Sequence, residues 1–255
     1  MYKSPKVKFN EEAHLYSEEE SGELLVGVTT VLQQMAKDFL APWAVKEMSL
    51  YLNDKWDIKK RYTQLEKGKI IDEGKKQWRV KSEQAKIDGT LAHEWIEQHI
   101  AGKNPAMPDN PKACNAINAF LKWEEAKKPK WLYNEIVVAN LQEGFKYAGK
   151  LDFIAEWDGK TYLGDFKTSS QIGEDYHLQT AAYQYALKQC GMKVDGRFLL
   201  RLDKETAEYE EYYVFTPYKF DLEVFACLYN THKWRQYYKN RTPAKEWKIK
   251  RYKLK

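Results

Sequence analysis

The sequence contains little cysteine and no long apolar run. The three cysteines among its 255 residues, Cys114, Cys190 and Cys227, are scattered and form no CxxC pair. This spacing argues against a disulfide framework, a structural zinc site and an iron–sulfur cluster, and it favours a reducing compartment such as the cytoplasm. The first residues have no apolar signal core, and no apolar run is long enough to cross a bilayer. We therefore expect neither a signal peptide nor a membrane partner.

The sequence also has only a small excess of positive over negative charge. The formal net charge is +5 and the sequence pI is about 8.8, which alone does not imply a nucleic-acid partner. The basic residues are nevertheless concentrated in two runs. Seven Lys or Arg stand against one acid in residues 241–255, and ten stand against four acids in residues 59–86. These runs would suit a polyanion, and a solvated helix face and an exposed tail are the alternative.

What the sequence does have is typical of a globular protein. Hydrophobic residues make up 43% and charged residues 31%, and the length suits one large domain or a domain with a subdomain. Nine Trp and eighteen Tyr are present. Such aromatic residues build cores and also stack on exposed bases.

The order of the expected elements indicates an α/β fold. The first part begins with a hairpin closed by the polar turn SEEESGE and continues with a helix capped by Thr29 or Thr30, and the rest of it is mainly helical. Its later elements are a helical stretch over 43–86, a helix ending at Gly102, and a helix from Asn110-Pro111 to before Pro129.

Strands dominate the second part. The expected strands are WLYNEIVVAN, then KYAGKLDFIAEW and KTYLGDFKTSS joined at Asp158-Gly159, and later the hairpin of GRFLLRL and AEYEEYYVF. Helices are expected from about Asp175 to Cys190 and from Pro217 towards Tyr238. This order predicts a small mixed central sheet flanked by helices, with a helical N-terminal part.

Charged residues cluster in the expected central hairpin. Alternation along a strand places Asp165 and Lys167 on one face, and likewise Lys150 and Asp152. Asp152 lies seven residues before Gly159 and Asp165 six after it, so the hairpin brings the two carboxylates together. Glu135, on the preceding strand, would complete a cluster of three.

Clustered carboxylates repel one another unless a cation lies between them. Hard oxygen ligands select Mg²⁺ or Mn²⁺ rather than zinc, and such an ion can activate water for attack on a phosphate. Lys167 would orient that water and stabilise the charge of the transition state. The alternative is a surface hairpin with ordinary salt bridges on one wet face. The apolar residues on both sides of these charges favour the metal site.

Five short segments follow one another in an order that resembles a nuclease signature. Glu135, the GKLD segment ending at Asp152 and the DFK segment Asp165–Lys167 read E…GxxD…(D/E)xK. The segment from Gly89 to His93 reads GxxxH, and that from Gln179 to Tyr183 reads QxxxY. The series resembles the PD-(D/E)XK nuclease superfamily and, in its GxxxH and QxxxY elements, the RecB-like exonuclease branch of phage and bacterial type. The opening VTTVLQQMAKDFLAPWAVK is similar to the start of such members.

The resemblance implies a restriction-endonuclease-like core in a single nuclease domain, 1–255. Residues 1–128 would form the hairpin and the helical part, 129–240 the catalytic core, and 241–255 a basic tail. The resemblance implies that Asp152 and Asp165 are the principal metal ligands, that the carbonyl of Phe166 is another, and that Glu135 is a further ligand or holds the water. It implies that Lys167 is the catalytic lysine and that His93 binds metal from the helical side in a two-metal arrangement. Gln179 and Tyr183 would support the site and contact the DNA backbone. Without the resemblance, His93 reads as a structural histidine, and Gln179 and Tyr183 as half-buried helix residues.

The activity implied is that of a DNA nuclease using one or two Mg²⁺ or Mn²⁺ ions and no iron–sulfur cluster, because the four cysteines of iron–sulfur members are lacking. We expect an exonuclease acting on single- or double-stranded DNA ends in recombination, repair or phage DNA processing, in the cytoplasm or a host's cytoplasm. The chain has no GxxxxGK[ST] motif, so a helicase or recombination partner would be a separate protein. The alternatives are a sequence- or structure-specific endonuclease, a catalytically inactive DNA-binding protein, and an RNA-directed nuclease.

Overall fold

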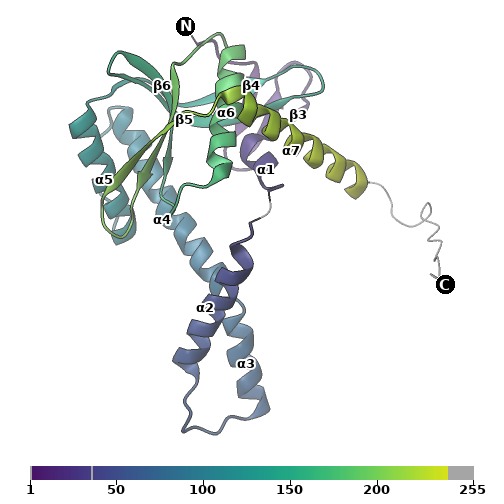
Figure 1. Cartoon of the computed structure of the whole chain (residues 1–255), viewed down its shortest axis with the longest axis vertical. Coiled ribbons are helices and arrows are strands. Elements are labelled where there is room, and N and C mark those ends of the chain that lie inside the picture. Colours follow the sequence, from purple (N-terminus) through teal and green to yellow (C-terminus); the bar gives the residue numbers. More distant parts are fainter. Residues whose placement is uncertain (1, 36, 241–255) are drawn as a thin grey trace, which may run out of the picture.

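The computed structural model describes residues 2–35 and 37–240 and places a mixed sheet between two layers of helices (Figure 1). The basic tail expected at 241–255 lies outside the described residues. The strands are β1 Val7–Asn10, β2 Leu15–Glu18, β3 Leu24–Gly27, β4 Lys130–Asn140, β5 Tyr147–Trp157, β6 Lys160–Lys167, β7 Gly196–Leu202 and β8 Tyr209–Val214. The helices are α1 Val28–Leu32, α2 Leu40–Lys55, α3 Gln64–Gly74, α4 Gln77–Ile100, α5 Pro111–Lys127, α6 Glu174–Gln189 and α7 Tyr218–Lys239.

Strand β5 is the centre of the sheet and has three neighbours. β4 pairs antiparallel along one edge of it. The other edge is shared: β3 pairs in parallel at Tyr147 and Ala148, and β6 pairs antiparallel from Phe153 onwards. Between these two contacts, residues 149–152 have no partner strand on that edge among the described residues. Because β3 and β6 diverge there, this part of β5 borders an opening in the sheet, which Gly149, Lys150 and Asp152 line.

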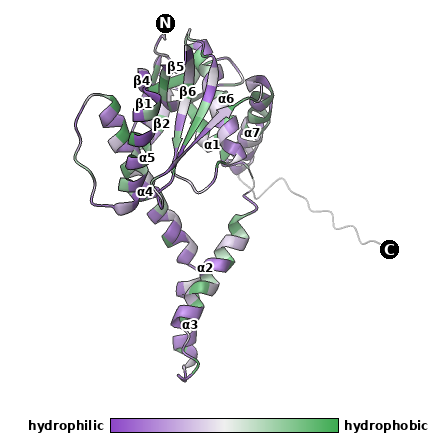
Figure 2. Cartoon of the chain, turned by 60° about the vertical axis from the view of Figure 1, so that its left-hand side comes forward, coloured by the Kyte–Doolittle hydropathy of each residue, from purple (hydrophilic) through white to green (hydrophobic). Residues whose placement is uncertain are grey.

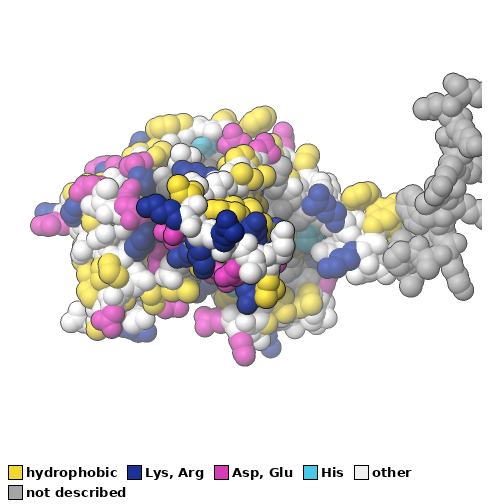
Figure 3. Space-filling model, turned by 90° about the horizontal axis from the view of Figure 1, so that it is seen from below, with side chains coloured by type: hydrophobic (Ala, Val, Ile, Leu, Met, Phe, Trp, Pro, Cys, Tyr) yellow, Lys and Arg dark blue, Asp and Glu magenta, His cyan; other side chains and the backbone are white. Residues whose placement is uncertain are grey.

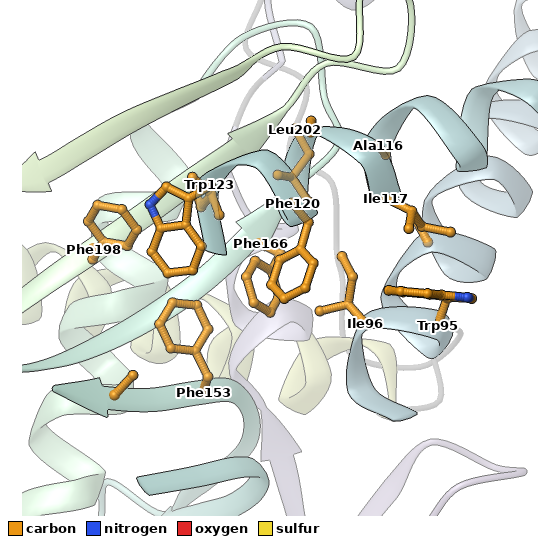
Figure 4. Close-up of a cluster of buried hydrophobic side chains, with 14 of the residues drawn as sticks. Trp95, Ile96, Ala116, Ile117, Phe120, Trp123, Phe153, Phe166, Phe198 and Leu202 are labelled. Atoms are coloured by element: carbon orange, nitrogen blue, oxygen red, sulfur yellow. The ribbon is translucent and has the colours of Figure 1, made fainter. Parts of the chain in front are cut away.

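An aromatic core fills one side of the sheet. Helices α4 and α5 pack there around Phe120, Trp123, Phe153 and Phe198, which are all fully buried (Figure 4). The opposite side is covered by α1, α6 and α7. The expectation of a mixed central sheet flanked by helices is therefore confirmed. The hairpin turn after β5 is also confirmed, because Asp158 and Gly159 both have the positive φ, 51° and 70°, that a tight two-residue turn requires.

The N-terminal part differs from the sequence-based prediction. Three strands precede α1 where a two-stranded hairpin was expected, because residues Leu15–Glu18 at the edge of the polar stretch form β2. The turn is correspondingly shorter and uses Gly22, with a φ of 70°, next to β3. Neither Thr29 nor Thr30 caps the helix. The N-cap is Gly27, because α1 begins directly where β3 ends.

Residues 40–81, which we call the arm, project away from the sheet (Figures 1 and 2). α2 packs against α3 and against the start of α4, with the Trp43 and Trp78 rings 6.4 Å apart. Thr63 and Glu66 form a capping box that starts α3. The helical stretch expected over 43–86 is thus present, interrupted between α2 and α3 and briefly between α3 and α4. Among the described residues, no helix combines the length and apolar character needed to cross a membrane.

Candidate active site

A cleft of about 1290 Å³ opens where β3 and β6 diverge. Its walls come from the N-terminal strands, α4, the central strands and α6. The structure brings seven of the eight sequence-predicted site residues to this cleft by their side chains: His93, Glu135, Asp152, Asp165, Lys167, Gln179 and Tyr183. The eighth, Phe166, turns its ring into the aromatic core (Figure 4) and takes part through its backbone.

Asp165 is almost completely buried, with 1% of its surface exposed. One carboxylate oxygen, Oδ1, accepts a hydrogen bond of 3.2 Å from the Gln179 amide. The other, Oδ2, is in ion-pair contact with the Lys167 ammonium, but without hydrogen-bond geometry. A buried carboxylate oxygen that lacks a hydrogen-bond donor is costly, so this atom is suited to a further cation.

Asp152 lies beside it, at the point where β5 and β6 separate. Its Oδ2 accepts a hydrogen bond of 2.7 Å from the backbone N–H of Phe166. Burial and the nearby negative charge of Asp165 raise the pKa of Asp152 to about 8. The strand alternation breaks here, because Leu151 packs on the α6 side while Phe153, two residues on, packs on the α5 side.

Lys167 is held by three neighbours. Its ammonium contacts Asp165 and donates a hydrogen bond of 3.0 Å to the Gln179 amide oxygen. Burial alone lowers the pKa of Lys167, but the charges of Asp165 and Asp152 outweigh it, so the pKa is raised and the ammonium stays charged. The Tyr176 ring lies 4.3 Å from the ammonium in a cation–π contact. Sequence reasoning gave Tyr176 no role, although its position one turn before Gln179 could have indicated one.

The QxxxY and GxxD segments fit each other sterically. Gln179 donates a hydrogen bond of 3.1 Å to the Tyr183 hydroxyl, so the two residues act as one unit along α6. The Tyr183 ring rests on the backbone of Gly149. A Cβ atom at Gly149 would lie 2.4 Å from the ring, closer than packed atoms approach, so this contact requires glycine.

The GxxxH segment brings α4 to the same place. A Cβ atom at Gly89 would lie 2.9 Å from the Thr168 hydroxyl, so glycine permits the close approach of the helix to the end of β6. One turn later, His93 places its Nδ1 3.7 Å from Asp152 Oδ2, with the side chain 34% exposed. Burial lowers the pKa of His93 against the opposing pull of Asp165, which favours the neutral imidazole that binds metals.

Glu135 sits differently from the expected carboxylate cluster. Its φ of 52° is in the left-handed region, which interrupts the β4–β5 ladder opposite Asp152. The side chain pairs with Lys150 at 2.6 Å. Burial and the charge of Asp152 nevertheless raise the pKa of Glu135 to about 7. Strained backbone of this kind is common at functional sites.

The residues present fit a divalent cation. In the part of the chain that the structure describes, no three acidic, His or Cys side chains already surround one point as a closed metal site. Asp165 Oδ2, however, has only its ion pair with Lys167, and burial together with the charge of Asp165 raises the pKa of Asp152. A cation between these two carboxylates would relieve both costs. The oxygen donors suit Mg²⁺ or Mn²⁺.

Comparisons with known proteins identify the family of the chain. No curated protein sequence matches the chain significantly, whereas thirteen chains of solved structures do. One of these, described as "Crystal structure of SSO0001", is 13% identical with a TM-score of 0.32 over 46% of this chain and 57% of its own. That likeness is too weak to argue from. The family model of the PD-(D/E)XK nuclease superfamily matches residues 61–253. The chain therefore belongs to the PD-(D/E)XK nuclease superfamily, a superfamily of metal-dependent nucleases.

Proposed function

We propose that this protein is a DNA exonuclease of the RecB-like branch that removes nucleotides from single- or double-stranded ends with Mg²⁺ or Mn²⁺. The observation that carries the proposal is the hydrogen-bonded chain of Lys167, Gln179, Asp165 and Tyr183. It joins the DxK and QxxxY segments into one unit around the buried carboxylate of Asp165. We place the activity in recombination, repair or phage DNA processing in the cytoplasm, with any helicase on a separate protein.

Each residue has a role that follows from its surroundings. Asp152 and Asp165 would hold the cation together with the Phe166 carbonyl, and His93 would hold a second ion from α4. A bound divalent cation supplies activation of the attacking water and neutralisation of phosphate charge. Lys167 is fixed in place by Gln179 and Asp165, so its ammonium stabilises the negative charge that develops on the phosphate without reorganising first.

Glu135 and Lys150 form the second wall of the site. The ammonium of Lys150 is engaged by Glu135 and therefore neutralises a carboxylate that would otherwise repel the phosphate. We assign Glu135 to holding the water that attacks, through the side-chain oxygen that Lys150 does not occupy. Gln179 and Tyr183 position Lys167 and Asp165 from helix α6. The Gln179 amide is hydrogen-bonded to both Lys167 and Asp165.

The test is digestion of end-labelled DNA. Linear DNA, single- or double-stranded and labelled at either end, is incubated with Mg²⁺, Mn²⁺ or chelator, beside a closed circle and a matched RNA. Mononucleotides or short products released from one end, an intact circle and inactivity in chelator are expected. Cutting of the closed circle would instead identify an endonuclease. Preference for RNA would identify an RNA-directed enzyme, and no cleavage with any divalent ion would overturn the proposal.

A pair of variants ties the activity to the site. Lys167→Ala removes the ammonium, and we expect cleavage to fall by at least about 10²-fold while DNA binding persists. Glu174→Gln removes a charge from an exposed position at the start of α6, outside the cleft, and serves as the matched control. Full activity of Lys167→Ala would remove the lysine from the mechanism.

A further inference from the structure

The cleft offers little to attract a polyanion. Among its lining residues, six carboxylates, Glu11, Glu94, Glu97, Glu135, Asp152 and Asp165, stand against the three lysines Lys86, Lys150 and Lys167. All three lysines are already paired, with Glu83, Glu135 and Asp165 respectively. Even with two divalent ions bound, the cleft supplies a small net attraction for DNA. Affinity for a long strand must therefore come from another surface.

The arm carries the opposite charge balance. Its residues, 40–81, include eleven Lys or Arg and six Asp or Glu, a formal net charge of +5 that equals that of the whole chain. Lys59, Arg61 and Lys69 are exposed there and have no ion pair within the described residues. Figure 3 views the molecule from below, so the arm points at the reader, and it shows Lys and Arg side chains gathered over that end.

Aromatic and apolar side chains are interleaved with these cations at the tip. Trp56 is 40% exposed and Ile58 is 92% exposed. The Tyr62 ring lies 5.8 Å from the Trp56 ring, with the Lys60 ammonium 4.9 Å from its centre. Figure 2 shows hydrophobic and hydrophilic residues mixed along the arm. Exposed aromatic rings between cations are the means by which proteins hold single-stranded nucleic acid, by stacking bases and neutralising phosphates.

The arm is connected rigidly to the site. α4 runs without a break from Gln77 in the arm to His93 in the cleft, and sixteen residues of α-helix span roughly 24 Å. α3 carries the tip further from the sheet (Figure 1). At about 3.4 Å per stacked nucleotide, the base of the arm is some seven nucleotides from the cleft, and the tip is further away.

We propose that the arm is a single-strand holding element. Its tip stacks an unpaired base on Trp56 and binds the backbone of the same strand through Lys59 and Arg61, seven or more nucleotides from the phosphate in the cleft. This inference rests on the proposed function, because it takes the occupant of the cleft to be DNA. It adds a second binding site, which the enzyme uses for long strands and cannot use for short ones.

Two arm variants and one control test the proposal in the full-length protein. Lys59→Ala/Arg61→Ala removes both phosphate contacts, and Trp56→Ala removes the stacking ring. Lys193→Ala/Lys219→Ala removes two exposed lysines from outside the arm and the cleft. Circular dichroism at 222 nm confirms that each variant retains its helices, and Trp56→Tyr, which keeps an aromatic ring, should restore binding.

The readout is strand-length dependence. Binding of a 20-nucleotide single strand in chelator should weaken by about 10-fold in the double arm variant, with a salt slope lower by roughly one unit. Trp56→Ala should weaken it by about 5-fold or more. Cleavage of a four-nucleotide strand with Mn²⁺ should stay within about twofold of wild type for both arm variants. The lysine control should match wild type on both strands.

Three outcomes would overturn the inference. The first is unchanged affinity and salt slope for the long strand. The second is an equal loss on the four-nucleotide strand. The third is a change of oligomeric state in the arm variants without a change in DNA affinity, which would identify a protein-docking arm. If the wild-type protein binds the long strand through the arm but cleaves nothing with Mg²⁺ or Mn²⁺, the proposed function fails while the holding element stands.

Discussion

Carboxylates outnumber lysines by six to three around the cleft, whereas cations outnumber acids by eleven to six in the arm. The two regions differ equally in packing. In the cleft, Asp165 is buried and Lys167 half-buried beside an aromatic core, and both are held by Gln179. In α2 and α3, only Glu47 and Gly74 are buried, and at the tip Trp56 is 40% exposed.

This difference fits the roles proposed for the two regions. Catalysis needs charges fixed to within fractions of an ångström in a site of low polarity, where they act strongly and where carboxylates can bind a cation. Holding a flexible strand needs reach, cations and stacking surfaces, none of which requires a core. On this proposal, the strongest electrostatic interactions lie where the protein is best packed, and the substrate-holding surface lies where it is most exposed.

The largest expected effect is in the cleft. Asp165→Asn keeps the shape of the side chain but removes the charge that pairs with Lys167 and that would hold the proposed cation. Cleavage should fall by about 10³-fold or more, comparable to other losses of an essential electrostatic partner. Metal-free affinity for DNA should stay the same or rise, because the cleft loses a negative charge. Measurement of both quantities separates the two regions, and a parallel fall in affinity would mean that the cleft, not the arm, holds the strand.

The second effect concerns pH and metal. Because the pKa of Asp152 is raised to about 8 in the folded protein, against about 4 in an unfolded chain, the folded state binds more protons across this range. Stability in chelator should therefore fall as the pH rises from 5 to 8, by about 3 kcal/mol. Glu135, raised to about 7, adds to the same trend.

Urea unfolding at several pH values measures this fall. Mg²⁺ should reduce it, since the ion replaces the proton on the same carboxylates, and Asp152→Asn should reduce it without metal. A free energy of unfolding that is independent of pH between 5 and 8 in chelator would show that the two carboxylates are not crowded as the structure places them.

A third prediction compares two glycines. Gly149→Ala puts a methyl group 2.4 Å from the Tyr183 ring and should destabilise the protein by about 2 kcal/mol, because the ring and its Gln179 contact must shift. Gly68→Ala, in α3, meets no atom within 4 Å and should stabilise that helix by about 0.5–1 kcal/mol. Thermal unfolding of both variants measures the pair. A harmless Gly149→Ala would mean that the QxxxY tyrosine does not rest on the GxxD strand.

Much of the fold could be predicted from local signals. The Asp158-Gly159 turn and the Asn110-Pro111 cap of α5 are each encoded within a few residues, and the structure confirms both. β5 also forms where it was expected, although its alternation breaks after Leu151. β2 was missed because Leu15–Glu18 is short and half polar, so only its pairing with β1 and β3 identifies it as a strand. The projection of the arm depends on packing between segments far apart in the sequence, which no local pattern encodes.

The sequence predicted which residues gather at the candidate site, but it did not predict how all of them are arranged there. Strand spacing indicated that Asp152 and Asp165 would meet, and the structure places both in the cleft. The left-handed backbone of Glu135 and its pairing with Lys150 could not be read from alternation, because alternation assumes a regular strand. The position of Tyr176 over Lys167 depends on where α6 crosses β6, a tertiary feature that spacing along one helix leaves open.

The smallest expected effect tests whether the arm folds as a separate unit. Thr63→Ala removes the capping box that starts α3, in which Thr63 and Glu66 satisfy each other's backbone N–H groups. Loss of such a cap costs about 1 kcal/mol, so amide exchange in Gln64–Gly74 should quicken by roughly fivefold, measured by hydrogen–deuterium exchange. Ser49→Ala in α2 is the control, because the Ser49 hydroxyl only bonds a carbonyl within its own helix.

Exchange in β5 and β6 should be unchanged, since the arm has few buried contacts through which its loosening could reach them. Equal quickening there would mean that the arm and the cleft unfold together, and the contrast between a rigid site and a loosely packed grip would have to be abandoned.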